Sequence, residues 1–254
     1  MKEQWRLLKT DFNTASTNMA IDRAVLVANS KGEVPPTVRF FGWSPPAISI
    51  GYFQSLEEEI DLDACRKFGV DYVRRITGGG AVFHEKEVTY SIVIPESHPG
   101  IPKNIMGSYG RICGAIMKGL KHLGIESRYV PINDIITDGK KISGSAQTRK
   151  AKTVLQHGTV LIDVDVDKMF SLLRVPDEKI KDKLIADVKQ RVTSIKHLIG
   201  REIGFDEAVV AMKNGFEEEF GVELIKGVLT EEEKRLTRKF ELEYFSAREW
   251  NHRR

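Results

Sequence analysis

Residues 74–84, Arg-Arg-Ile-Thr-Gly-Gly-Gly-Ala-Val-Phe-His, are the most informative stretch of the chain. Three consecutive glycines follow two arginines and an extended run at residues 70–73. Glycine lets backbone N–H groups approach an anion because no Cβ stands in the way, and arginine supplies a fixed fork of donors for phosphate or carboxylate. The stretch therefore predicts a strand that leads into a phosphate-binding loop. Its spacing matches neither a Walker loop nor G-x-G-x-x-G, and a tight turn with surface arginines is the structural alternative.

A second informative segment lies at residues 133–147. Asp138-Gly139 is a strong signal for a type I′ hairpin turn, and it joins extended residues 135–137 to residues 141–143. Alternation along the second strand puts Lys141 and Ser143 on one face and Ile142 on the other. A lysine held on a strand is suited to neutralising a phosphate, or a carbonyl that gains charge. A solvated lysine that protects a sheet edge is the alternative.

Length and composition favour an ordinary soluble domain. The 254 residues fit one large domain, and 41% hydrophobic with 30% charged residues is a typical globular balance. The net charge of +3 is too small to indicate nucleic acid, and no apolar run approaches the ~18 residues that span a membrane. The first residues lack the apolar core of a signal peptide, and Cys65 and Cys113 form no metal-ligand spacing. We expect a reduced, cytoplasmic protein whose partners are neither nucleic acid nor membrane.

The apolar pattern predicts strands mainly in the first two-thirds of the chain and helices in the last third. This order favours an α+β fold with a mixed, largely antiparallel sheet. The predicted helices are residues 14–29, 61–68 and 105–123 and the region after Val166, and the predicted strands are residues 37–41, 47–53, 88–94 and 153–163.

The two segments, in this order, resemble the lipoate–protein ligase and octanoyltransferase family, which shares a catalytic fold with biotin–protein ligases. The resemblance begins at Trp5-Arg6 and ends at Glu249-Trp250-Asn251. It implies one catalytic domain over residues 1–254, helical from about 166 to 254, without the accessory C-terminal domain of many ligases. The implied fold is α+β and biotinyl/lipoyl-ligase-like (class II synthetase-like), with a mixed, largely antiparallel sheet flanked by helices. The matching motifs are Arg74-Arg75-x-x-Gly-Gly-Gly-Ala-Val-Phe-His84, Asn133-Asp134, Gly139-Lys-Lys141-Ile-Ser-Gly-Ser-Ala146 and Gln156-His157-Gly158-Thr159.

The resemblance also implies a nucleotide site and an acyl pocket. Lys141, not Lys140, matches the family's catalytic lysine because Ile-Ser-Gly follows it, and Asp134 would hold Mg²⁺. His84 could be a general base, although a hydrogen-bonded structural histidine is the favoured alternative. The residues implied for the nucleotide or acyl-adenylate are Arg75, Gly79, Gly80, Ala81, Val82, Phe83, Asn133, Asp134 and Lys141. Those implied for the acyl pocket are Tyr52, Phe53, His84, His157 and Gly158.

The main functional expectation is a lipoate–protein ligase. Such an enzyme activates lipoate with ATP and Mg²⁺ to lipoyl-adenylate, and transfers the lipoyl group to a lysine of a lipoyl domain. The implied acceptors are the glycine cleavage H protein and the E2 subunits of 2-oxoacid dehydrogenases. The enzyme would act alone or with a separate small accessory subunit.

Two alternatives stay open. An octanoyltransferase of the similar branch moves octanoate from acyl carrier protein through a cysteine located just before the segment here numbered 134–137. This chain has no cysteine there, and Cys65 and Cys113 lie in predicted helices as small buried hydrophobes. A non-catalytic lipoate-binding protein would not need the phosphate-binding set of Arg75, Gly80 and Lys141.

Overall fold

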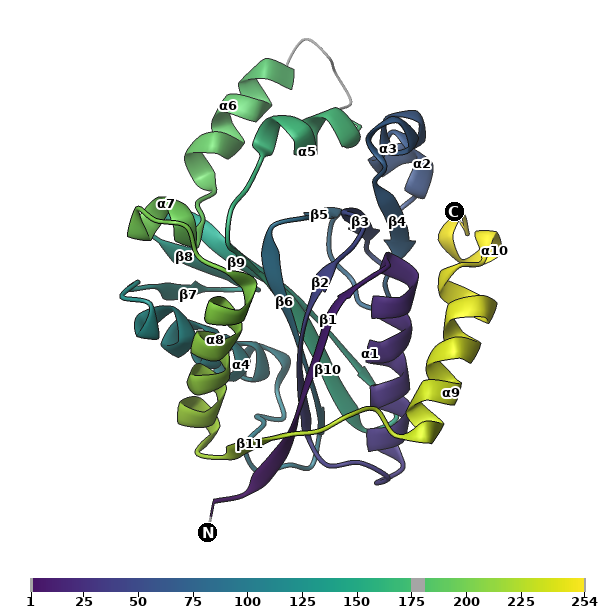
Figure 1. Cartoon of the computed structure of the whole chain (residues 1–254), viewed down its shortest axis with the longest axis vertical. Coiled ribbons are helices and arrows are strands. Elements are labelled where there is room, and N and C mark those ends of the chain that lie inside the picture. The colour runs from purple at the N-terminus through teal and green to yellow at the C-terminus, as the bar shows by residue number, and fades with distance from the viewer. Residues whose placement is uncertain (1, 175–180, 254) are drawn as a thin grey trace.

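The computed structural model describes residues 2–174 and 181–253. Its centre is an eight-stranded sheet in the order β11-β1-β2-β6-β10-β9-β8-β7 (Figure 1). The β11–β1 and β1–β2 pairs are parallel, and the other pairs are antiparallel. The strands are Gln4–Asn13 (β1), Thr37–Trp43 (β2), Glu87–Pro95 (β6), Arg128–Val130 (β7), Asp134–Thr137 (β8), Lys140–Lys150 (β9), Thr153–Leu161 (β10) and Glu223–Lys226 (β11).

Helices cover both faces of this sheet (Figure 1). One face carries α1 and α9, and the opposite face carries α4 and α8. A π-helical turn and a short last helix continue from α9. The bounds are Ala15–Ser30 (α1), Ile105–His122 (α4), Phe205–Phe220 (α8), Glu231–Phe240 (α9), Glu241–Phe245 (η2) and Arg248–Asn251 (α10).

Strand alternation explains why the central strands are buried along their whole length. Successive side chains point to opposite faces of a sheet. Phe40 and Val154 therefore pack in the core beneath α4 and α8, whereas Phe41 and Leu155 pack in the core beneath α1 and α9. Burying such a side chain contributes about 1.5–3 kcal/mol. Because these two cores fill both faces, the space for a ligand lies toward β8 and β9 and a second, smaller sheet.

The smaller sheet has the strand order β4-β3-β5. Its core includes Ile48, Ile50 and Leu56 and also Leu172 from α5. Helices α5 and α6 lie above this sheet at the top of Figure 1. The bounds are Ala47–Ile50 (β3), Asp71–Arg74 (β4), Val82–His84 (β5), Leu56–Glu59 (α2), Leu62–Phe68 (α3), Val166–Leu172 (α5), Lys181–Arg191 (α6) and Ile195–Ile199 (α7).

The expected fold class is confirmed: the protein is α+β, with a mixed, largely antiparallel sheet flanked by helices. Local signals also hold. Asp138 and Gly139 have φ of 48° and 78°, as the predicted type I′ turn requires. Gly69, with φ of 63°, ends α3 in the left-handed conformation that glycine adopts without strain.

Three features differ from the expectations. The region after Val166 is predicted to consist of helices and loops, but β11 in this region pairs in parallel with β1, and neither strand is predicted. Such short apolar runs are ambiguous until a neighbouring strand pairs with them. The strand expected at residues 47–53 ends at Ile50, and residues 51–54 turn away from it.

Candidate active site

A cavity of about 320 Å³ lies between the small sheet, strands β9 and β10, and the helices α5 and α6. Polar groups gather around the glycine loop and β9, while apolar side chains come from α1, β2, the end of β10 and the segments around α5 and α6. The lining residues are Met19, Trp43, Ser49, Arg75, Gly79, Gly80, Ala81, Val82, Phe83, His84, Thr89, Asn133, Lys141, Ser143, Gly144, Ser145, Ala146, His157, Gly158, Thr159, Leu161, Val164, Val166, Met169, Val188 and Val192.

The glycine loop is held by very close backbone packing. It joins β4 to β5, and Gly79 has φ of +97°, a conformation that L side chains rarely adopt. A Cβ on Gly79 would lie 2.8 Å from Arg75 Nη2, and a Cβ on Gly51 would lie only 1.9 Å from the Gly79 carbonyl oxygen. Both positions therefore require glycine for the loop to keep this shape.

Arg75 acts as a clamp inside this loop. Its Nη2 donates to the carbonyl oxygens of Gly78 and Gly80, at 2.8 Å each, and its Nη1 donates to the Ser49 carbonyl at 2.9 Å. The side chain is almost fully buried, and burial lowers the pKa of the guanidinium to about 10. Arg75 thus lines the cavity and at the same time fixes the loop.

Neighbouring Arg74 ties the strand before the loop to the end of the chain. Its Nε and Nη2 donate to the carbonyl oxygens of Trp250 and Asn251, at 3.0 and 2.9 Å. The Trp250 indole donates to the Arg74 carbonyl oxygen at 2.8 Å. The two neighbouring arginines therefore have different roles: Arg75 holds the glycine loop, and Arg74 anchors α10.

Lys141 stands on the opposite side of the cavity, on β9. Its Nζ forms an ion pair with Asp134 Oδ1 at 2.7 Å, and its carbonyl oxygen accepts from the Thr193 amide at 2.9 Å. Gly144 makes room for the lysine side chain, since a Cβ at that position would lie 2.8 Å from Lys141 Nζ. Ile142 points away into the core, as the alternation predicted.

Asn133 has a supporting position in the same region. Its Nδ2 donates to the Ser145 carbonyl oxygen at 2.8 Å, and its own carbonyl accepts from the Ser145 amide at 3.0 Å. These bonds hold the residue preceding β8 against β9. Asn133 therefore helps to fix Asp134 opposite Lys141 and lines the cavity itself.

Two buried histidines form part of the cavity wall. His84 stacks on Trp43, with ring centroids 4.0 Å apart and an interplanar angle of 15°. His157 lies on β10, where its Nδ1 is 3.1 Å from Asp22 Oδ2. Burial lowers the pKa of His157, although Asp22 opposes this change. Trp43, Met19 and Leu161 make this part of the cavity apolar enough for an alkyl chain.

The structure brings most of the expected site residues to one cavity. Eleven of them line it: Arg75, Gly79, Gly80, Ala81, Val82, Phe83, His84, Asn133, Lys141, His157 and Gly158. Asp134 reaches it through its ion pair with Lys141. Tyr52 and Phe53 are placed elsewhere, because β3 ends before them: Phe53 is 67% exposed, and the Tyr52 ring packs edge-on against Trp250.

The apolar part of the lining was missed by sequence reasoning. Val164, Val166, Met169, Val188 and Val192 reach the cavity from the segments around α5 and α6. In the sequence they look like ordinary helix and core residues. Only the three-dimensional placement of these segments over β9 shows that their side chains face a cavity.

Both cysteines are buried and lie outside the cavity lining. Cys113 on α4 sits behind Ser145, with Sγ 3.8 Å from its Oγ, and is 1% exposed. Burial raises the pKa of Cys113 and of Cys65 to about 11 in each case. Neither residue therefore has the thiolate character of a nucleophile at neutral pH.

A family model for the lipoyl protein ligase A/B catalytic domain matches residues 14–217. The chain belongs to this family. Among curated relatives, it is 38% identical to the octanoyltransferase LipM of Geobacillus kaustophilus over 276 residues, covering 100% of this chain and 99% of the relative. It is 39% identical to the octanoyltransferase LipM of Clostridioides difficile over 270 residues, covering 99% of both.

Solved structures of this family have the same fold. A bi-partite lipoate protein ligase from Thermoplasma acidophilum superposes with a TM-score of 0.90 at 30% identity, covering 98% of this chain and 96% of that one. A lipoate-protein ligase A bound with ATP superposes with a TM-score of 0.84 at 28% identity, covering 99% of both chains. The chain is thus similar to both octanoyltransferases and ligases, with identities of 38% and 39% to the two octanoyltransferases and of 30% and 28% to the two ligases.

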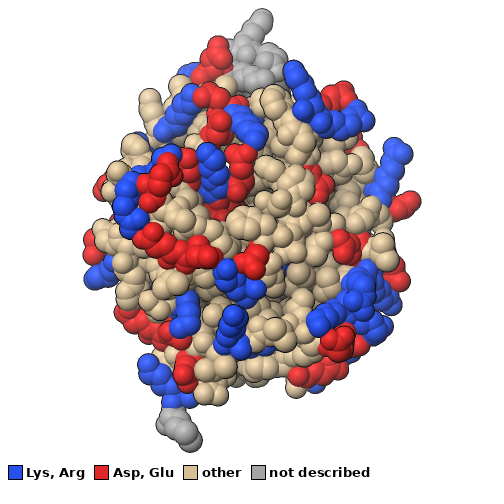
Figure 2. Space-filling model, viewed as in Figure 1, with Lys and Arg blue, Asp and Glu red and all other residues tan. Residues whose placement is uncertain are grey.

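Within residues 2–174 and 181–253, no helix is long and apolar enough to cross a membrane. Figure 2 shows that acidic and basic side chains are interspersed on the face viewed, so neither sign of charge dominates it.

Proposed function

We propose that this protein is an acid-activating lipoate–protein ligase: it forms an acyl-adenylate from lipoate or octanoate and ATP, and transfers the acyl group to a lysine of a lipoyl domain. The observation that carries this proposal is the pairing of a glycine loop and Lys141 around one cavity that neither cysteine lines. A thioester route needs a nucleophilic thiolate, and both thiols are buried with raised pKa values.

The proposed chemistry has two steps. The carboxylate oxygen of the acid attacks the α-phosphorus of ATP, the bond to the bridging oxygen breaks, and pyrophosphate leaves. The acceptor lysine nitrogen then attacks the acyl carbon, the carbon–oxygen bond to the phosphate breaks, and AMP leaves while the nitrogen loses a proton. Both steps develop negative charge on phosphate oxygens, which fixed cationic and amide donors stabilise.

The residues of this chain suit that chemistry. Lys141 would offset charge on the α-phosphate and the acyl carbonyl, and the backbone N–H groups around Gly79 and Gly80 would bind phosphate oxygens. Mg²⁺ that arrives with ATP commonly takes one or two carboxylates beside the phosphates, and Asp134 next to Lys141 is suited to hold it. The wall formed by Trp43, Met19 and Leu161 would hold the alkyl chain.

A second candidate is octanoyl transfer from acyl carrier protein, because relatives named octanoyltransferase LipM match the whole chain at 33–39% identity. For this candidate Cys113 is the cysteine nearer to the lining residue Ser145. Octanoyl transfer would require Cys113 to become accessible.

One assay separates the two candidates. The purified protein is incubated with an apo lipoyl domain in two arms, one with lipoate and ATP-Mg²⁺ and one with octanoyl carrier protein without ATP, and the acceptor is weighed by mass spectrometry. Modification in the first arm alone supports the ligase, and modification in the second arm alone supports the octanoyltransferase. ATP–pyrophosphate exchange without acceptor separates a ligase from a non-catalytic binder.

The acceptor and a possible second subunit are part of the same proposal. The Thermoplasma relative is described together with its E2 lipoyl domain and as bi-partite. We therefore propose an E2 or H-protein lipoyl domain as the acceptor. Activity of this chain alone would remove the need for a separate accessory subunit.

A further inference from the structure

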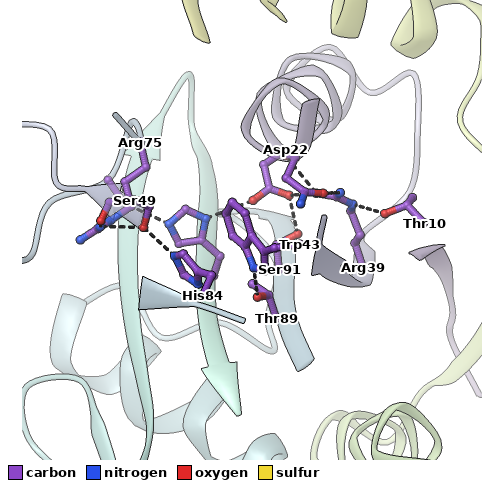
Figure 3. Close-up of polar contacts among 12 residues, drawn as sticks. Thr10, Asp22, Arg39, Trp43, Ser49, Arg75, His84, Thr89 and Ser91 are labelled. Carbon is purple, nitrogen blue, oxygen red and sulfur yellow. Dashed lines mark hydrogen bonds and ion pairs between the residues drawn. The ribbon is translucent and has the colours of Figure 1, made fainter. Parts of the chain in front are cut away.

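Two buried carboxylates outside the proposed chemistry are each connected through a histidine to the glycine loop. Figure 3 shows Asp22 with Arg39 and Ser91 at one end of this polar network, and His84 with Ser49 and Arg75 at the other. Asp22 comes from α1 and Glu87 from the start of β6, and the two residues are 1% and 2% exposed. Burying a carboxylate is costly unless it is hydrogen-bonded. The partners of each carboxylate therefore show what the burial achieves.

The first chain of contacts starts at Asp22. Its Oδ1 accepts from Arg39 Nη1 and from Ser91 Oγ, both at 2.8 Å, which anchors the carboxylate from the sheet. Its Oδ2 lies 3.1 Å from His157 Nδ1. On the other side of the same ring, His157 Nε2 lies 2.8 Å from the Thr77 hydroxyl. Thr77 directly precedes the three glycines of the loop.

The second chain starts at Glu87. Its Oε1 accepts from Trp43 Nε1 at 3.1 Å and lies 2.7 Å from His84 Nδ1. His84 Nε2 then lies 2.7 Å from the Ser49 hydroxyl, whose oxygen also accepts from Arg75 Nη1 at 3.1 Å. This series of hydrogen bonds therefore ends at Arg75, which also binds the loop carbonyls.

The donor and acceptor properties of the side chains determine which atom carries the proton in each hydrogen bond, and the result is the same for both series of contacts. Glu87 Oε1 accepts from the Trp43 indole, which only donates, and the same oxygen accepts from His84 Nδ1–H. Arg39 and His157 contact different oxygens of Asp22, but the ionised carboxylate that pairs with Arg39 only accepts, so His157 Nδ1 carries the proton that faces it. Each Nε2 is then free to accept from a hydroxyl, Thr77 in one chain and Ser49 in the other. The Ser49 oxygen in turn accepts from Arg75. Burial lowers the pKa of His157, which agrees with a neutral ring that accepts at Nε2.

We propose that Asp22 and Glu87 are positioning residues that fix the orientation of His157 and His84 and thereby hold the glycine loop in its anion-binding shape before substrate arrives. The hydrogen bonds that start at Asp22 end at Thr77, where the loop begins. Those that start at Glu87 end at Arg75, which binds the carbonyls of Gly78 and Gly80. The proposal rests on the proposed function for the identity of the anion, an acyl-adenylate. The preorganised loop itself is a property of the free protein.

The first test therefore needs no activity. Amide hydrogen exchange is measured by mass spectrometry in the free wild type and in Asp22→Asn and Glu87→Gln, at the two amides whose hydrogen bonds hold the loop: Arg75 N–H to the Ile50 carbonyl and Tyr52 N–H to the Thr77 carbonyl. Glu233→Gln is the matched control, because Glu233 is also a buried carboxylate, bonded to Arg6 far from the loop. We expect exchange of these amides to accelerate about 10-fold or more in both test variants, and not in the control after correction for its melting temperature.

Thr77→Val and Ser49→Ala provide a second route that leaves both carboxylates in place. Each substitution removes the hydroxyl that contacts one of the two histidines, and each is expected to accelerate amide hydrogen exchange in the same way. If Asp22→Asn or Glu87→Gln does not fold, these two variants decide the outcome. Unchanged exchange of these amides in Thr77→Val and Ser49→Ala would overturn the proposal.

Kinetics then separate positioning from simple support of the fold. In an active enzyme, Glu87→Gln should lower kcat roughly 10–100-fold, as small displacements of reacting groups do, with little change in KM for the acceptor. In a His84→Gln background the same substitution should have a much smaller effect, because the contact of Glu87 with that ring is already lost and only its contacts with Trp43 and Thr89 remain. Equal effects in both backgrounds would contradict the assigned route. Absence of any ATP-dependent activity in the wild type would remove the proposed function but not the exchange result.

Discussion

Lys141 on β9 and Asp134 on β8 form a diagonal ion pair between neighbouring strands, with the ammonium 2.7 Å from the carboxylate oxygen. Both side chains keep contact with solvent, at 42% and 34% exposure. The pair holds the lysine beside the cavity while leaving part of its hydrogen-bonding capacity open. A phosphate bound in the cavity would then gain a cation that is already in place.

Lys141→Ala is expected to abolish acceptor modification with little change in melting temperature, whereas Lys140→Ala should be mild. Removing one preorganised donor from a developing charge typically costs about 3–4 kcal/mol of barrier, or 10²–10³-fold in rate. Lys141 lines the cavity, and Lys140 instead faces a separate surface depression. The measurement is the initial rate of lipoylation for both variants. Equal losses would show that the wrong lysine has been assigned.

Gly144→Ala should lower activity without lowering stability. The added Cβ would lie 2.8 Å from Lys141 Nζ and Cε, so the flexible lysine must move while the backbone stays. Gly204→Ala is the control, since no described atom lies within 4 Å of a Cβ placed there. Lipoylation rates and thermal melts of the two variants check this expectation. A melting temperature that falls in step with activity would point to a fold defect instead.

Gly79→Val is expected to distort the backbone of the loop, whereas Gly80→Val is expected to leave the backbone intact and only block the ligand. Gly79 has φ of +97°, so a β-branched residue there strains the backbone and clashes with Arg75. No described atom lies within 4 Å of a Cβ on Gly80, so Gly80→Val should fold well and still block the approach of phosphate. Calorimetric titration with a non-hydrolysable lipoyl-adenylate analogue measures the loss. Normal affinity in folded Gly80→Val would mean that the loop is only a turn.

Cys65→Ser combined with Cys113→Ser should retain activity, because both thiols are buried away from the cavity lining and have pKa values raised to about 11. Initial rates of the double variant are compared with those of the wild type. Mass spectrometry of the wild type after incubation with octanoyl carrier protein gives the complementary evidence. An acyl-enzyme trapped on either cysteine would favour the octanoyltransferase over the ligase.

Stability is expected to fall as the pH drops below about 6.5, the ordinary pKa of histidine. Burial lowers the pKa of His157 in the folded protein, so below pH 6.5 the unfolded chain binds a proton that the folded protein does not. The free energy of unfolding therefore decreases toward acid by up to about 1.4 kcal/mol per pH unit. Urea unfolding at pH 7.5 and 5.5 measures this slope. A slope unchanged in His157→Gln would assign it to other groups.

Local rules predicted much of the fold because the relevant interactions are short-ranged in sequence. The Asp138-Gly139 turn and the glycine after α3 are determined by backbone preferences within a few residues. Alternation placed Lys141 and Ser143 on the face opposite Ile142, as the structure has them, whereas the choice of Lys141 over Lys140 came from the family resemblance. Strand β11 could not be found in this way, since only its pairing with β1, more than 200 residues earlier, makes it a strand.

The hydrogen bonds between the buried carboxylates and histidines of the site also could not be predicted from patterns within a few residues. Asp22 and His157 are 135 residues apart in the chain, and each alone resembles an ordinary surface or core residue. Tyr52 and Phe53 show the opposite error, because the family resemblance implied that both residues line the acyl pocket. The turn after Ile50 carries both residues away from the cavity.

The stacking of Trp43 on His84 gives the cavity its own optical signal. The chain has three tryptophans, of which Trp5 lies in the core beneath α8 and Trp250 packs beside Arg74. Only Trp43 lines the cavity, so a shift of emission on addition of an eight-carbon acid would come from this indole. With Trp5 and Trp250 replaced by phenylalanine, the remaining fluorescence would report filling of the acyl site in real time and without a label.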